Sequence, residues 1–227
     1  MIDDKLDIYE AGKNAYNIQI YILKDAYSKY FISWGTIFIA IVLYMLMAYI
    51  VNKQFLWIYY FTGYPLIIIT GSFLNYSIFS KTAIFKNFSI YFREKNMLEK
   101  NMNTLRYLLI ILISIYSISI LIFIFNLPYN QIFYFIFNVF LYIVIMLIGL
   151  FAYRSISLTF DFIPEVWKIS FFIFFLTNIV SIILNYFYII SGDYILTEII
   201  SYIIWVIAGL VWILSGIKTL RGNTVNG

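Results

Sequence analysis

The sequence predicts an all-α, polytopic integral membrane protein: a bundle of six transmembrane helices with an amphipathic helix in front of them. Three observations lead to this prediction. Of the 227 residues, 63% are hydrophobic and only 11% are charged, whereas a soluble domain is about 25% charged. The apolar residues gather in six stretches, each long enough to cross a bilayer as a helix, which takes about 20 residues. The basic residues gather in alternate connections between these stretches.

The six predicted spans pair into three helical hairpins, because every second connection is only a few residues long. The hairpins turn at 52–54, at 126–130 and at 191–193. Connections this short place consecutive helices side by side and antiparallel. In chain order, the predicted spans are 30–51, 55–79, 105–125, 132–153, 167–190 and 194–217.

The second span contains Gly63 and Pro65. Proline has no backbone N–H and its ring crowds the preceding turn, so a proline inside a helix bends it. We therefore predict a kink here. Kinked helices occur in transporters and also in bundles that transport nothing, so the kink alone does not choose between these classes.

The distribution of Lys and Arg predicts the orientation of the bundle. Such residues accumulate on the cytoplasmic side. Here they lie in 1–29, in or beside the connections after the second and fourth spans, and in the tail 218–227. Lys53 is the only one of the 15 basic residues on the opposite side. We expect a multi-pass protein of the cell membrane with a cytoplasmic N-terminus and a cytoplasmic C-terminus.

Besides the lipid bilayer, a protein partner is expected at two cytoplasmic segments. Residues 1–29 repeat apolar side chains at steps of three and four, which is typical of an amphipathic helix. This helix suits the membrane interface, a short coiled coil with a partner, or a plain lead-in to the first span. The loop 81–104 interleaves basic and aromatic residues beside the membrane. That position favours anionic headgroups or a cytoplasmic protein, and we expect no nucleic acid.

Several kinds of chemistry are excluded by residue types that the chain lacks. It contains no Cys and no His, so thiol catalysis, His-dependent triads and His-ligated haem are excluded. No phosphate-binding glycine loop or nucleophile elbow is found. Charged residues keep to the loops and span ends, so a proton-coupled carrier lacks its usual intramembrane carboxylate. We therefore predict no catalytic, cofactor-binding or metal-binding residues, no cofactor and no enzymatic activity.

The fifth predicted span contains a stripe of polar residues: Asn178, Ser181 and Asn185. Their spacing of three and seven residues places them on one face of a helix. Two interpretations are open. Such groups hold helices together through hydrogen bonds inside a membrane, and they also line the polar cavities of transport proteins.

A second candidate is an ion pair at the outer rim. Glu198 lies a few residues inside the sixth span, and Lys53 is the only base on that side, with Asp193 as a competitor for it. A structural pair between Lys53 and Glu198 is the simpler interpretation, and a gate for an ion or a substrate is the alternative.

Two hypotheses of function follow from these patterns. The first is a transport- or channel-associated membrane subunit that acts with a partner. The second is a non-catalytic scaffold that assembles a membrane complex through 1–29 and 81–104. Transport predicts a polar cavity formed by the second, third and fifth spans, whereas a scaffold predicts dry, tight packing there.

Overall fold

The computed structural model describes residues 2–51, 131–160, 163–192 and 194–224, together with parts of 70–78 and 103–118. Within these residues every regular element is an α-helix, and no strand occurs. The four long helices are α1 (Ile2–Val51), α4 (Gln131–Thr159), α5 (Glu165–Ser191) and α6 (Tyr194–Thr224). The predicted all-α class is confirmed for this part of the chain.

All four helices are long and apolar enough to cross a membrane. The qualifying stretches are Ile20–Met47, Asn138–Leu158, Glu165–Ser191 and Leu196–Gly222. They overlap the first, fourth, fifth and sixth predicted spans, which supports a membrane protein. The second and third predicted spans lie mostly outside the described residues. The count of six spans and the three hairpins therefore stay predictions.

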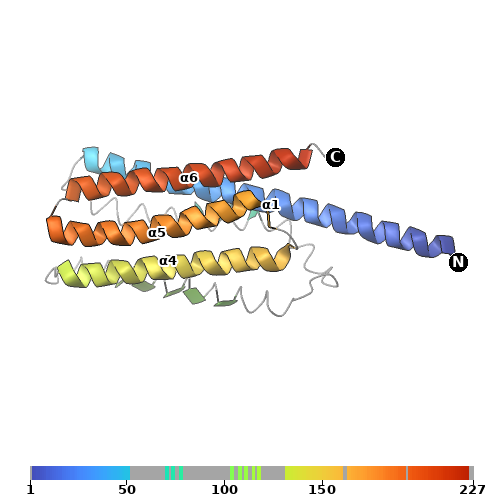
Figure 1. Cartoon of the computed structure of the whole chain (residues 1–227), viewed down its shortest axis with the longest axis horizontal. Helices are drawn as coiled ribbons and strands as arrows, with labels where there is room; N and C mark the ends of the chain where they lie inside the picture. Colours follow the sequence, from blue (N-terminus) through green and yellow to red (C-terminus); the bar gives the residue numbers. More distant parts are fainter. Residues whose placement is uncertain are drawn as a thin grey trace.

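Helix α1 runs without a break through the predicted lead-in helix and the first predicted span. Its 50 residues, at about 1.5 Å each, make a rod about 75 Å long, far longer than the hydrocarbon core of about 30 Å. Figure 1 shows its N-terminal part reaching well beyond the other helices. The chain from 2 to 51 contains no proline, so nothing in it ends the helix between the two predicted segments.

The helices pack as antiparallel neighbours. Helix α6 packs against α1 on one side and α5 on the other, and α5 in turn packs against α4 (Figure 1). The step from α5 to α6 is short because Gly192 adopts a left-handed conformation with φ of 69°. Its N–H donates to the carbonyl oxygen of Tyr188 at 2.9 Å. Glycine enters this conformation without steric cost, so α5 ends there and α6 begins two residues later.

Helices α1 and α6 approach each other so closely that their backbones touch. A Cβ atom added to Gly35 would lie 2.5 Å from the carbonyl oxygen of Gly209, and one on Gly209 would lie 2.7 Å from that of Gly35. One on Gly216 would lie 2.5 Å from the carbonyl oxygen of Ser28. Seven residues separate the two contacts on each helix, so the helices keep one register over two turns. Small residues allow this kind of approach in membranes.

An aromatic core fills the same half of the bundle, near the start of α5 and the end of α6. Trp167 and Phe31 are fully buried, and their rings stack with centroids 5.3 Å apart. Trp212 lies against Phe31 with a centroid distance of 4.8 Å. The opposite faces of α5 and α6 expose large apolar side chains, mostly at steps of three or four residues, among them Ile179, Ile183, Ile203 and Ile207. In water such faces would be unfavourable; in a bilayer they contact lipid.

Candidate functional site

The inner face of α5 carries a line of polar side chains through the apolar bundle. Ser170, Thr177, Asn178 and Ser181 are buried, and Asn185 is half-buried. The three residues predicted as a stripe therefore share an inward-facing side of the helix. Ile179 and Ile183, at 47% and 46% exposure, lie on the outward side of α5 between them. The line divides into two clusters with different hydrogen bonding.

The first, which we call the serine cluster, consists of Ser170, Ser215 and Thr219. Ser170 Oγ lies 2.7 Å from Ser215 Oγ, and both hydroxyls lie 3.0 Å from the carbonyl oxygen of Val166. Each hydroxyl has a single proton, so one of them donates to the carbonyl and the other donates to its neighbour. Thr219 donates to the carbonyl oxygen of Ser215 at 2.9 Å.

Two buried indoles complete the serine cluster. Trp167 donates from Nε1 to Thr219 Oγ1 at 3.0 Å. Trp212 donates from Nε1 to the carbonyl oxygen of Ser170 at 2.9 Å. These bonds link α5 to α6, and every polar side chain of the cluster has a partner. The serine cluster therefore holds two helices together, as hydrogen bonds within membranes commonly do.

The second group, the asparagine cluster, consists of Asn138, Asn178, Ser181 and Asn185. Asn178 Nδ2 donates to the carbonyl oxygen of Phe174 at 2.8 Å, and Asn185 Nδ2 donates to that of Ser181 at 2.9 Å. Each of these two amides thus donates one N–H group to its own helix. Asn138 Nδ2 of α4 reaches Asn185 Oδ1 at 3.4 Å, a long contact.

The position of the asparagine cluster follows from how α4 and α5 pack. A Cβ on Gly149 of α4 would lie 2.5 Å from the ring of Phe174, so the glycine makes room for that ring. Eleven residues separate Gly149 from Asn138, and eleven separate Phe174 from Asn185. The close packing at one end therefore sets the register that brings the two asparagines level at the other.

Two atoms of the asparagine cluster lack a partner. Asn178 Oδ1 and Ser181 Oγ are buried, and within the described part of the chain neither makes a hydrogen bond. The amide orientation of Asn178 is determined by the bond from its Nδ2, which leaves Oδ1 as the free acceptor. Burying a polar group without a partner costs about 1–3 kcal/mol. The cluster therefore presents a hydrogen-bond acceptor and a hydroxyl, one helical turn apart, that are ready for a further polar group.

The other predicted site residues lie elsewhere. Lys53, Gly63 and Pro65 are outside the described residues, so the outer ion pair and the kink stay predictions. Glu198 is half-buried near the start of α6, at the end of the bundle opposite the aromatic core. No group of three or more potential metal ligands occurs in the described ranges.

Two features of the site were not anticipated from the sequence. The sequence predicts neither the bonds of Ser215 and Thr219 with α5 nor the place of Trp167 in the serine cluster. The spacing of Ser215 and Thr219 by four residues does place them on one face of α6. That spacing does not reveal which neighbouring helix the face meets.

Comparison with known proteins adds no further assignment. No protein-family model, curated protein or solved structure matches this chain.

Proposed function

We propose that this chain is a transport- or channel-associated membrane subunit, and that the asparagine cluster forms part of its polar path. The proposal is carried by one observation: the buried atoms Asn178 Oδ1 and Ser181 Oγ have no hydrogen-bond partner among the described residues. Polar groups inside a membrane are costly and tend to serve function. If these two groups only joined helices, we would expect each of them to have a hydrogen-bond partner, as every polar side chain of the serine cluster does.

The chemistry of the cluster suits a small neutral or singly positive solute, or a file of water molecules. The two atoms without a partner among the described residues are both oxygens, so oxygen atoms are what the cluster offers. Oxygen ligands suit hydrogen-bond donors and hard monovalent cations. A divalent cation would require carboxylates, and none lies among the four residues of the cluster.

The energy for transport would come from a partner, since the chain contains no nucleotide-binding motif. The projecting part of α1 is the natural contact for such a partner. Glu10, Lys13, Asn14 and Asn17 are exposed there. A rigid rod that extends beyond the membrane would transmit a movement of the partner directly to the bundle.

A cysteine-accessibility experiment tests the polar path. The chain contains no Cys, so each introduced cysteine is the only one present. In native membranes, Asn178→Cys and Ser181→Cys should react with a small cationic methanethiosulfonate, because a thiol must ionise in water to react. The matched controls are Ser170→Cys in the serine cluster and Ile183→Cys on the outward face. Both should stay unlabelled.

The alternative function is a scaffold for a membrane complex. It is favoured by the same long α1 and by the close contact of α1 with α6 at Gly35 and Gly209. A scaffold requires no water inside the bundle. If Asn178→Cys and Ser181→Cys remain as unreactive as the two controls while the variants fold, the polar path is contradicted and the scaffold becomes the better hypothesis.

A further inference from the structure

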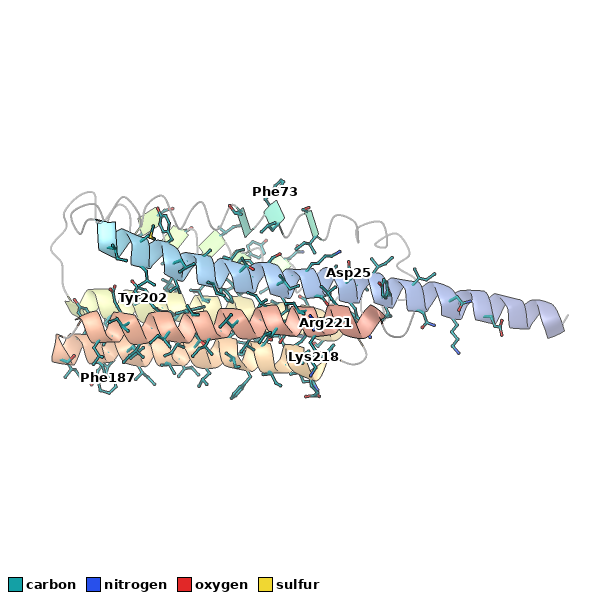
Figure 2. All side chains as sticks on the ribbon, turned by 90° about the horizontal axis from the view of Figure 1, so that it is seen from above. Asp25, Phe73, Phe187, Tyr202, Lys218 and Arg221 are labelled. Atoms are coloured by element: carbon teal, nitrogen blue, oxygen red, sulfur yellow. The ribbon has the colours of Figure 1, made fainter. Side chains whose placement is uncertain are left out.

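A cavity of about 350 Å³ lies at the end of the bundle where α5 begins and α6 ends. Three helices line it: α1 through Lys24, α5 through residues 164–166, and α6 through Lys218, Thr219 and Gly222. Figure 2 shows Lys218 and Arg221 at this end of α6, with Asp25 on the passing α1. This cavity is separate from the asparagine cluster, which lies toward the other end of α5.

The cavity lies at the boundary between membrane and water. The stretches long and apolar enough to cross the bilayer begin at Ile20 in α1 and at Glu165 in α5, and the one in α6 ends at Gly222. Glu165 and Gly222 are residues of the cavity lining, and Ile20 lies about one helical turn from the lining residue Lys24. Lipid headgroups are found at this depth. The distribution of basic residues predicts that this side is cytoplasmic, where anionic lipids are concentrated.

The electrostatics of the cavity favour an anion. Lys24 and Lys218 bring two ammonium groups from different helices, and neither forms an ion pair within the described residues. The single acid of the lining, Glu165, is engaged by Lys168, whose Nζ lies 2.7 Å from its carboxylate. Asp25, next to Lys24, is engaged by Lys29 in the same way. Among the described residues, the positive charge of the two lysines is therefore uncompensated.

The remaining groups of the lining are either occupied or favourable to the same kind of ligand. The Thr219 hydroxyl accepts from Trp167 and donates to Ser215. Pro164 is the N-cap of α5 and makes no side-chain cap bond, and the acid of the first turn, Glu165, is paired with Lys168. The positive end of the helix dipole therefore lies at the cavity. This end adds to the field of the two lysines and does not define the cavity by itself.

We propose that the cavity binds a phosphate group, held by the ammonium groups of Lys24 and Lys218. The cavity is open to its surroundings, and its volume of about 350 Å³ exceeds what a bare ion needs. Two sources share this chemistry, the headgroup of an anionic phospholipid and a free phosphate compound. A phosphate group from either source would hold α1, α5 and α6 together at the boundary between membrane and water. A partner bound to the projecting part of α1 would act on the bundle through this boundary.

The experiment measures lipid retention and phosphate binding on the same purified protein. Native mass spectrometry compares the retention of phosphatidylglycerol with that of phosphatidylcholine. The thermal midpoint is measured with inorganic phosphate and with chloride at equal ionic strength. The double variant Lys24→Gln/Lys218→Gln should lose about thirtyfold of the affinity that the wild type shows, since each basic residue near the surface contributes about fivefold.

The control is Lys13→Gln/Arg154→Gln, which removes the same charge at two exposed positions outside the cavity and should behave as the wild type. Glu165→Gln should bind more tightly, because it frees Lys168 and removes the acid. Preference for phosphatidylglycerol without a response to phosphate identifies the lipid headgroup. A response to phosphate without a preference among lipids identifies a soluble phosphate compound. The proposal is overturned if the wild type shows neither response, or if the control variant loses as much affinity as Lys24→Gln/Lys218→Gln.

Discussion

Single atoms distinguish the two polar clusters on α5. In the serine cluster the hydroxyls and indoles all have partners, whereas in the asparagine cluster the oxygen atoms of Asn178 and Ser181 have none within the described residues. Such a difference is invisible in composition, because both clusters are built from small polar residues on the same helix face. The difference depends on which hydrogen-bonding groups the neighbouring helix places beside each cluster.

We predict opposite effects of two conservative substitutions on stability. Ser170→Ala removes the 2.7 Å bond to Ser215 and should destabilise the protein by about 1 kcal/mol, a usual value within membranes. Ser181→Ala removes a buried hydroxyl without a partner and should leave stability unchanged or raise it by about 1 kcal/mol. The midpoints of thermal unfolding in one detergent provide the comparison. An equal loss in both variants would mean that the Ser181 hydroxyl is bonded after all.

Among the described helices, α1 and α6 are in direct backbone contact. It depends on glycines at the crossing, since Gly35 and Gly209 each face the other's carbonyl oxygen. A backbone atom cannot move aside as a flexible side chain can, so an added methyl group must push the helices apart. The aromatic core, which both helices share at Phe31 and Trp212, would loosen with them.

We predict that Gly35→Ala or Gly209→Ala destabilises the protein by about 1–3 kcal/mol, the cost of overpacking a filled core. Gly222→Ala serves as the control, because an added Cβ there has no atom within 4 Å. Alanine favours the helix over glycine, so this control should be neutral or slightly stabilising. Chemical or thermal unfolding measures all three variants. A Gly209→Ala protein as stable as the control would show that the two helices are not in backbone contact.

At the scale of the whole molecule, the described helices form a four-helix, antiparallel arrangement with one member far longer than the rest (Figure 1). The long member, α1, passes the aromatic core and the cavity and continues beyond the bundle. A partner bound to its free end would be mechanically joined to both. This geometry suits either proposed role, since a subunit driven by a partner and a scaffold both require a rigid connection out of the membrane.

The orientation of the molecule is open to a direct test. With the charge distribution as predicted, Lys53→Cys and Ser191→Cys should be labelled by an impermeant thiol reagent added outside intact cells, and Lys95→Cys should be labelled only after lysis. The absence of native Cys makes each signal unambiguous. The reverse pattern would invert the predicted topology and would move the phosphate cavity to the outer leaflet.

Composition and the length of the apolar stretches are enough to predict the all-α membrane class and the four described spans. Hydrophobicity and helix length act locally: a stretch such as 167–190 must form a helix in lipid, because every backbone polar group there needs a partner within its own segment. The continuity of α1 could also have been anticipated, since no residue breaks it. The inward direction of Asn178, Ser181 and Asn185 could not be derived from their spacing alone.

The division of the polar residues into a serine cluster and an asparagine cluster depends on contacts between helices. The bond of Ser170 to Ser215, the donation of Trp167 to Thr219 and the approach of Asn138 to Asn185 join residues about 45–52 positions apart in the chain. Such contacts depend on the register of one helix against another. That register is set by a few glycines and large rings that fit together, here Gly149 with Phe174 and Gly35 with Gly209. A periodic sequence pattern specifies which face of a helix is polar, but shape complementarity between helices specifies what that face meets.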